Sequence, residues 1–409
     1  MKYVLIIGDG MADFPLDTLG GKTPLEAAAK PVIDGLSKNG LLGRARTVPE
    51  GFPPGSDTAI MSIFGCAPQK YYSGRAPLEA AAQGISLNAG DAAMRCNNIS
   101  ISGTSFRDST IISHSAGTLP EGMGRELVEW LFNHPEFTPL AEKAGMSINP
   151  TDSYRHIAVM KGFDLTGVEL SPPHDHLGEK VCNNLPAANS GGVLISLMES
   201  AHELLKPPPF NIEREKSGLP PANAVWFWAE GTAATLPNFK DQYKKSGAVI
   251  SAVPLCHGIA TLAGLDVIYV EGATGELDTN YTGKVNAAIS ALKTHDFIAL
   301  HYEAPDECTH CGDLPGKLQA IEWLDSRITA PVLAALEING EPFRILVISD
   351  HFTLSDSGIH DGTPVPFIIY DSRENEGSGL TYTEKNAEYG PYVEDATRLM
   401  EMLFQDDNQ

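Results

Sequence analysis

The sequence predicts an α/β fold, in which helices flank a mostly parallel sheet and a smaller α/β domain is inserted into the larger one. Short, almost wholly apolar runs recur along the chain between helical patterns, as in parallel sheets that are covered on both faces. The length of 409 residues, at about 150 residues per domain, suggests two or three domains. Between about residues 91 and 181 the runs become shorter and alternate in polarity, which indicates a separate domain.

The chain opens with an apolar run over residues 3–7, a Gly-Asp-Gly turn and a helical pattern over residues 24–38. Further strands of the larger sheet are expected at residues 224–228, 248–251, 267–270, 297–301, 345–349 and 366–370, with helices at 277–293 and 315–336. The inserted domain is expected to hold strands at 92–101, 109–113 and 156–161 and a helix at 121–132. These elements place the larger, discontinuous domain at 1–88 and 190–409 and the inserted domain at 89–189.

Charge and hydropathy argue against several classes of protein. The chain has 29 Lys+Arg against 52 Asp+Glu and a net charge of −23, whereas a nucleic-acid binder needs a basic face. The first apolar run is too short for a signal peptide, and no run approaches the roughly 18 residues of a membrane span. We therefore expect a cytoplasmic protein that binds neither nucleic acid nor membrane; its oligomeric state does not follow from the sequence.

Acidic residues and histidines stand at the ends of several predicted strands. In open α/β sheets, ligands bind at the carboxyl ends of parallel strands. Carboxylates gathered there repel one another unless a cation compensates them. Carboxylates mixed with imidazoles predict two divalent metal ions, with Mn²⁺ favoured over Zn²⁺ or Mg²⁺. These residues are Asp9, Asp306, His310, Asp350, His351 and His360.

A glycine- and proline-rich loop ends at Ser56, and an apolar helix follows it. This places a hydroxyl at a helix N-terminus, where free N–H groups and the helix dipole favour an anion. One interpretation is an ordinary N-cap serine. The other is a nucleophile that becomes phosphorylated, and it depends on the metal cluster.

Polar residues in and near the inserted domain are candidates for binding an anionic substrate. The planar guanidinium of arginine suits carboxylate and phosphate groups, whereas a lone surface arginine more often forms a salt bridge. The candidates are Arg75, Arg95, Asn97, Arg155, His156, His174 and Asp175.

Taken in order, these motifs resemble those of the archaeal-type cofactor-independent phosphoglycerate mutases of the alkaline phosphatase superfamily. The matching runs include Gly8-Asp9-Gly10-Met11-Ala12-Asp13, Pro54-Gly55-Ser56-Asp57, Glu303-Ala304-Pro305-Asp306 and Ser349-Asp350-His351. The resemblance implies an alkaline-phosphatase-like fold with one metal on Asp306, His310 and His360 and the other on Asp9, Ser56, Asp350 and His351. It also implies that 3-phosphoglycerate and 2-phosphoglycerate are interconverted through a phosphoserine without 2,3-bisphosphoglycerate, under an inserted domain that closes over the site.

Two departures from the family pattern leave further functions open. The usual Arg-Gly-Ala-Gly run is replaced by Trp226-Phe227-Trp228-Ala229-Glu230-Gly231, and the spacer between Asp306 and His310 also differs. The Trp-rich run resembles a bacterial subgroup proposed to act as homoserine kinases, which would need a separate phosphoryl donor. The same residues are also compatible with a phosphomonoesterase or with a non-catalytic protein that binds a metabolite. Among these functions the sequence favours the mutase.

Overall fold

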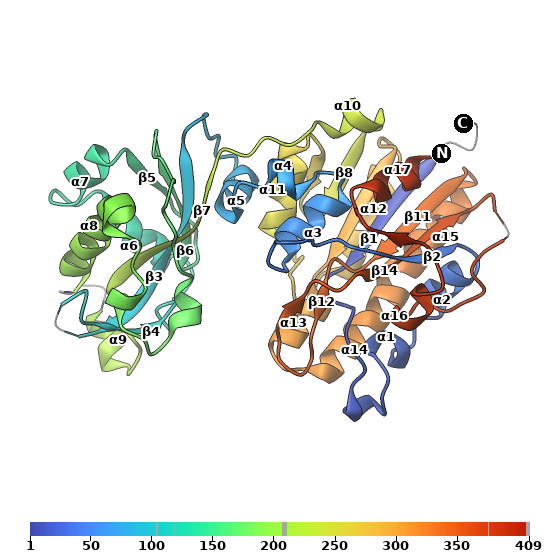
Figure 1. The fold of residues 1–409 in the computed structure, drawn as a ribbon, viewed down its shortest axis with the longest axis horizontal. Coiled ribbons are helices and arrows are strands. Elements are labelled where there is room, and N and C mark those ends of the chain that lie inside the picture. Colours follow the sequence, from blue (N-terminus) through green and yellow to red (C-terminus); the bar gives the residue numbers. More distant parts are fainter. Residues whose placement is uncertain (104, 118, 207–210, 375, 406–409) are drawn as a thin grey trace. The chain divides into compact units, whose positions relative to one another are not determined.

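The computed structural model describes residues 1–103, 105–117, 119–206, 211–374 and 376–405. The chain forms two compact units, one of residues 1–72 and 235–409 and one of residues 73–234 (Figure 1). The second unit interrupts the first, and it begins earlier and ends later than the range 89–189 expected from the sequence. The bounds differ because α5 (Arg75–Ala82) and β7 (Ala224–Thr232) pack with β3 (Ala92–Ser102) of the second unit.

The larger unit is built on an eight-stranded sheet with the order β15-β2-β14-β11-β1-β10-β8-β9. The strands from β11 to β9 in this order run parallel, whereas β14 is antiparallel to both of its neighbours. The prediction of a mostly parallel sheet is thereby confirmed. The strands are β1 (Lys2–Gly8), β2 (Leu41–Ala45), β8 (Gly247–Ile250), β9 (Asp266–Ile268), β10 (Phe297–Tyr302), β11 (Phe343–Ile348), β14 (Val365–Asp371) and β15 (Tyr392–Val393).

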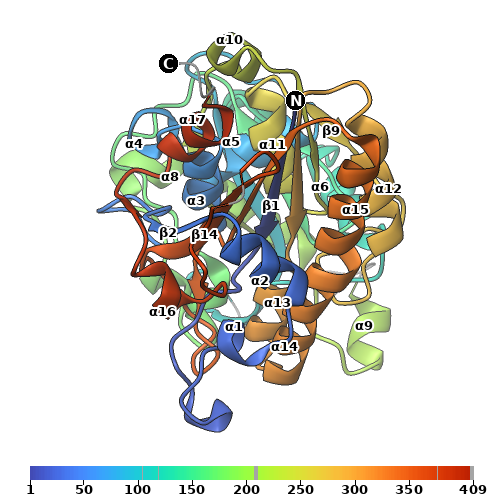
Figure 2. The same ribbon diagram turned by 90° about the vertical axis from the view of Figure 1, so that its right-hand side faces the viewer.

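Helices cover both faces of this sheet (Figure 2). Val4 and Ile6 of β1 point to the face that packs against α2 (Pro31–Lys38), α12 (Tyr281–Ala291), α14 (Leu314–Trp323) and α15 (Ala330–Asn339). Tyr3 points to the other face, where its ring lies 4.9 Å from that of Phe404 in α17 (Arg398–Phe404). That face also carries α3 (Ser56–Ile63) and α11 (Pro254–Leu262).

Two of the predicted helices are divided in the structure. The helix expected at 24–38 becomes α1 (Pro24–Ala27) and α2, because the residue before Pro31 is sterically kept out of the helical conformation. The helix expected at 315–336 becomes α14 and α15, joined by a wider π-helical turn at Leu324–Thr329.

The second unit contains a five-stranded antiparallel sheet, in which β3 lies between β6 (Arg155–Met160) and β7 and also pairs with β4 (Thr110–Ser113). The remaining strand is β5 (Met146–Asn149), and α6 (Met123–Phe132), α7 (Thr138–Lys143) and α8 (Ala188–Leu205) pack against one face. The strand expected at 224–228 in the larger sheet is therefore wrongly placed, since β7 pairs with β3. An apolar run looks the same in sequence whichever sheet buries it.

The two faces of the second sheet differ in chemistry. Cys96 and Phe227 point to the helices and are buried in the apolar core. Neighbouring residues of the same strands, Arg95 and Trp228, point to the opposite face because side chains alternate along a strand. This second face carries most of the predicted substrate-binding residues.

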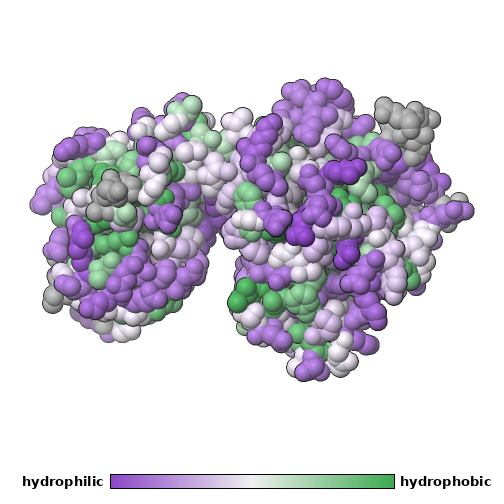
Figure 3. Space-filling view, in the orientation of Figure 1, coloured by the Kyte–Doolittle hydropathy of each residue, from purple (hydrophilic) through white to green (hydrophobic). Residues whose placement is uncertain are grey.

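The outer surface carries both hydrophilic and hydrophobic residues. Hydrophilic residues prevail on the face seen in Figure 3, and hydrophobic residues form separate patches there. No helix among the described residues combines the length and the apolar character needed to cross a membrane. All six cysteines are free thiols.

Candidate active site

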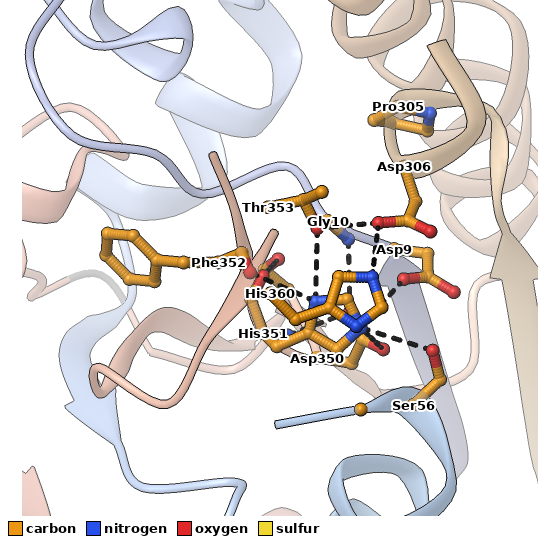
Figure 4. A network of polar contacts seen from close by, with 12 residues as sticks. Asp9, Gly10, Ser56, Pro305, Asp306, Asp350, His351, Phe352, Thr353 and His360 are labelled. Atoms are coloured by element: carbon orange, nitrogen blue, oxygen red, sulfur yellow. Dashed lines mark hydrogen bonds and ion pairs between the residues drawn. The ribbon is translucent and has the colours of Figure 1, made fainter. Parts of the chain in front are cut away.

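The predicted acidic and histidine side chains meet at one edge of the larger sheet (Figure 4). Asp9 follows β1 and Asp350 follows β11, and these adjacent strands are parallel, so their carboxyl ends lie together. Asp306 and His310 lie on α13 (Ala304–His310), which follows the next parallel strand, β10. His360 opens the short strand β13 (His360–Asp361). The sheet topology thus gathers residues that are far apart in the sequence.

Asp306, His310 and His360 form one group of potential metal ligands. The Nε2 atoms of the two histidines lie 2.9 Å apart. The carboxylate of Asp306 lies 3.1 Å from His310 Nε2 and 3.4 Å from His360 Nε2. Two imidazole nitrogens and a carboxylate directed at one point are the donor set that binds a first-row divalent cation.

Asp9, Asp306 and His351 form a second group. The Nε2 atom of His351 lies 3.5 Å from Asp9 Oδ1 and 3.2 Å from Asp350 Oδ2. Asp306 belongs to both groups, so a single carboxylate lies between two candidate cation positions. The donor set can therefore hold two divalent cations that share Asp306.

Neighbouring histidines and backbone N–H groups compensate these carboxylates only in part. Asp9 and Asp350 are 1% and 0% exposed, and Asp9 Oδ1 and Asp350 Oδ2 have no hydrogen-bond partner. Burial, together with the negative charges of Asp350 and Asp306, raises the pKa of Asp9 well above its ordinary value. Burying several negative charges close together is strongly unfavourable, so these side chains fit divalent cations that supply the missing positive charge.

Two residues of this site were missed by the sequence analysis. His301 Nε2, in β10, lies 3.0 Å from Asp9 Oδ2, and burial lowers the pKa of His301 to about 4. Thr353 donates its hydroxyl to Asp306 Oδ1 at 2.6 Å. His301 could have been found as the polar residue that ends an apolar strand, whereas Thr353 carries no comparable signal.

Ser56 lies in the first turn of α3, with its Oγ atom 3.2 Å from His351 Nε2. The N-cap residue of this helix is Gly55, so the structure does not support the N-cap interpretation of Ser56. The loop is held in place next to it, since the Tyr72 hydroxyl donates to Asp57 Oδ2 at 2.5 Å. The Ser56 hydroxyl therefore faces the acidic edge of the sheet.

Gly10 allows the backbone to approach this site closely. Its φ is +61°, and a Cβ atom there would lie 2.5 Å from Thr353 Oγ1 and 2.6 Å from Asp306 Oδ1. We expect Gly10→Ala to displace Asp306 and to lower divalent-metal affinity by about tenfold or more, measured by calorimetric titration. Gly20→Ala is the matched control, because Gly20 has a φ of +67° and open space around it. Equal metal affinity in the two variants would contradict this role of Gly10.

Three arginines gather on the polar face of the second sheet. Arg95 Nε donates to Glu79 Oε2 at 2.7 Å, and Arg75 Nε lies 3.2 Å from Glu79 Oε1. The guanidinium carbons of Arg95 and Arg155 lie 4.5 Å and 5.8 Å from the ring centroid of Trp228. The candidates Arg75, Arg95 and Arg155 therefore lie in one cluster, together with two residues that the sequence analysis did not assign to it.

This cluster carries positive charge at neutral pH. Burial alone would raise the pKa of Glu79, but its hydrogen bonds and ion pairs with arginines lower it to about 2. Burial lowers the pKa of Arg95 to about 10, so its guanidinium stays protonated. Three guanidinium groups and one carboxylate leave a net charge of +2 on this face of a chain whose net charge is −23.

The remaining predicted substrate residues are placed differently. The His174 ring lies 5.1 Å from that of Trp228, beside the arginines, and the neighbouring Asp175 is exposed. Both atoms of the Asn97 side-chain amide form hydrogen bonds: the oxygen accepts from Trp228 Nε1, and the nitrogen donates to the carbonyl of residue 114. His156 is not brought to this cluster: it is buried on the opposite face, with Asn98 and the backbone of residue 151 as partners.

His114 is a further residue at this face that the sequence analysis missed. Its ring lies 5.9 Å from the ring of His174 and 6.0 Å from that of Tyr154. His114 Nδ1 and Arg155 Nε are buried without a hydrogen-bond partner. Its sequence context, Ser113-His114-Ser115, gave no signal that distinguishes it from an ordinary surface histidine.

Comparisons with known proteins find relatives that match nearly the whole chain. A family model described as 2,3-bisphosphoglycerate-independent phosphoglycerate mutase matches residues 37–211. A "probable 2,3-bisphosphoglycerate-independent phosphoglycerate mutase" of Geobacter sulfurreducens is 43% identical, with 98% of this chain and 99% of that protein covered. The 2,3-bisphosphoglycerate-independent phosphoglycerate mutase of Methanosarcina acetivorans is 45% identical, with 95% of each chain covered.

Two solved structures are similar over nearly the whole chain. The PH0037 protein from Pyrococcus horikoshii has a TM-score of 0.80 and 27% identity, with coverage of 100% of this chain and 99% of that one. The cofactor-independent phosphoglycerate mutase from Thermoplasma acidophilum has a TM-score of 0.61 and 25% identity, with 99% of each chain covered. The fold, the converging site and the full-length relatives together establish that this chain belongs to the family of 2,3-bisphosphoglycerate-independent phosphoglycerate mutases.

Proposed function

We propose that this chain interconverts 3-phosphoglycerate and 2-phosphoglycerate without 2,3-bisphosphoglycerate, a step of glycolysis and gluconeogenesis. The observation that carries the proposal is the Ser56 hydroxyl, 3.2 Å from His351 Nε2, at the sheet edge where the carboxylates and histidines converge. A serine hydroxyl at a site that can bind divalent cations is suited to accept a phosphoryl group. The names of the full-length relatives supply the substrate.

In the proposed reaction, Ser56 Oγ attacks the phosphorus of 3-phosphoglycerate. The bond from phosphorus to the C3 oxygen breaks, the serine loses its proton, and the released glycerate gains one. Glycerate then reorients, and its C2 hydroxyl attacks the phosphoserine to give 2-phosphoglycerate and free Ser56. Atoms and charge balance with no outside phosphoryl donor, so the reaction is an isomerisation.

The proposed metal ligands combine the two groups described above, which share Asp306, with Ser56 and Asp350, which adjoin His351 of the second group. Asp306, His310 and His360 would hold one ion, and Asp9, Ser56, Asp350 and His351 would hold the other. Mn²⁺ is the proposed metal, since mixed carboxylate and imidazole ligands suit it. Bound divalent cations lower the pKa of a serine hydroxyl and offset the charge of the transferring phosphoryl group. His301, neutral beside Asp9, would hold that carboxylate in place.

The arginine cluster of the second unit is proposed to bind the substrate's anionic groups. Its net charge of +2 suits a phosphoglycerate, whereas the ammonium group of homoserine would be repelled. Arg95, Arg155 and His174 are the proposed contacts, because Asn97 and His156 are engaged elsewhere. The closing movement of this unit, the cytoplasmic location and the absence of nucleic-acid partners stay predictions.

The test is a coupled enolase assay on Mn²⁺-loaded protein with 3-phosphoglycerate and no 2,3-bisphosphoglycerate. Steady formation of phosphoenolpyruvate would support the mutase. Release of inorganic phosphate in its place would identify a phosphomonoesterase. No turnover with metal shown to be bound would overturn the proposal, and phosphorylation of homoserine in a screen of phosphoryl donors would then identify the kinase.

A further inference from the structure

Trp228 lies in the run that departs from the family's Arg-Gly-Ala-Gly pattern. It is 6% exposed, on the polar face of the second sheet. The guanidinium carbons of Arg95 and Arg155 lie 4.5 Å and 5.8 Å from its ring centroid, and its Nε1 donates to Asn97 Oδ1 at 2.9 Å. The His174 ring also lies 5.1 Å from it, so this one side chain contacts four of the residues predicted to bind substrate.

The contacts of Arg95 fix both the plane and one edge of its guanidinium. Glu79 accepts hydrogen bonds from Nε and from one terminal nitrogen of Arg95, which sets the edge. The ring of Trp228 sets the plane, because a guanidinium stacks on the electron-rich face of an indole. Without the ring, the long arginine side chain would regain rotamer freedom, and substrate binding would have to restrict it again.

Arg155 depends on aromatic rings in a similar way. Its guanidinium lies 5.4 Å from the ring centroid of Tyr154 and 5.8 Å from that of Trp228. Its Nε atom is buried without a hydrogen-bond partner. Arg95 and Arg155 repel each other, and Glu79 compensates only one positive charge, so the Trp228 ring also offsets the cost of holding two cations close together.

We propose that Trp228 is a positioning residue that holds Arg95 and Arg155 for an anionic group of the substrate, a carboxylate or a phosphate. The inference rests on the proposed function, since it takes the substrate to be a phosphoglycerate. An indole ring can neither accept a phosphoryl group nor exchange a proton at neutral pH, so we expect Trp228 to act on substrate binding and to leave the chemistry at Ser56 unchanged.

The test compares KM and kcat for 3-phosphoglycerate in the wild-type protein, Trp228→Leu and Trp228→Phe. Trp323→Phe is the matched control, because Arg327 stacks 3.7 Å from the Trp323 ring centroid in the other unit. We expect Trp228→Leu to raise KM about tenfold, because it removes the ring that contacts both arginines. Its kcat should stay within about threefold of the wild-type value. Trp228→Phe keeps a ring but not the N–H donor, so it should raise KM by about two- to threefold. Trp323→Phe should leave KM unchanged.

The outcomes separate this inference from the proposed function. No turnover by the wild-type protein would overturn the function and the inference with it. Wild-type turnover with an unchanged KM in both Trp228 variants would overturn the inference alone, as would a fall in kcat without a rise in KM. If thermal unfolding shows that Trp228→Leu does not fold, the test compares the KM values of Trp228→Phe and Trp323→Phe. A higher KM in Trp228→Phe would support the inference, and equal values would overturn it.

Discussion

Ser56→Ala is expected to lower mutase turnover by a factor on the order of 10⁴ or more, because no other group can take its place as the phosphoryl acceptor. The Oγ atom lies 3.2 Å from His351 Nε2 and is not used to cap α3, so its removal leaves the helix intact. We expect thermal unfolding to stay within a few degrees of the wild-type value. The measurement is the coupled enolase assay, with the Mn²⁺ content of each protein determined by mass spectrometry.

Ser62→Ala is the control for this result. Ser62 is buried on the same helix, and its hydroxyl donates to the carbonyl of Thr58 at 2.9 Å, far from any proposed chemistry. It should keep most of the wild-type turnover. Intact-mass analysis after acid quenching should show a phosphorylated fraction in the wild-type protein and in Ser62→Ala, and none in Ser56→Ala. Turnover retained by Ser56→Ala would refute the phosphoserine pathway.

Asp306→Asn is expected to lower both metal content and activity by at least about a hundredfold. Its carboxylate belongs to both groups of potential ligands, so an amide there weakens two cation positions at once. Although burial alone would raise it, hydrogen bonds from His310 and His360 hold the pKa of Asp306 well below its usual value. Asparagine cannot carry that negative charge. Calorimetric titration with Mn²⁺ measures the number of sites and their affinity.

Two further variants make this prediction specific. His310→Asn removes a ligand from one group only, so we expect it to weaken one Mn²⁺ site and to keep the other. Asp325→Asn changes an equally buried aspartate that accepts from the backbone of Ile33 at 2.6 Å, and it should alter stability but not the number of metal sites. If Asp306→Asn bound two Mn²⁺ ions with wild-type affinity, the assignment of the metal site would be wrong.

The structure also shows how much of the fold could be predicted from sequence. The parallel strands of the larger sheet are apolar and begin and end within a few residues of their expected positions, because buried strands leave a clear apolar run. The strand at 224–228 was assigned to the wrong sheet, because its run records burial and not the strand that pairs with it. The breaks near Pro31 and at Leu324–Thr329 depend on local backbone geometry that helical periodicity does not record.

For the site, residue type and position at strand ends were enough to find Asp9, Asp306 and Asp350, because parallel strands bring their carboxyl ends to one edge. They were not enough to find Thr353, whose contact with Asp306 joins parts of the chain 47 residues apart. His301, which contacts Asp9, stands at the end of a predicted strand and was overlooked although it carried the same signal. Nor could residue type and position separate Arg155 from His156, adjacent in sequence but on opposite faces of the second sheet.

The sequence by itself thus determined the α/β class, the family resemblance and the chemical groups of the phosphoryl-transfer site, because these depend on residue types and their order along the chain. Only the tertiary structure decided that Asp306 is shared by two ligand groups and that Ser56 faces His351 without capping its helix. It also decided that Trp228 contacts two arginines. These facts are distances between residues far apart in the chain, and packing, not local pattern, sets such distances.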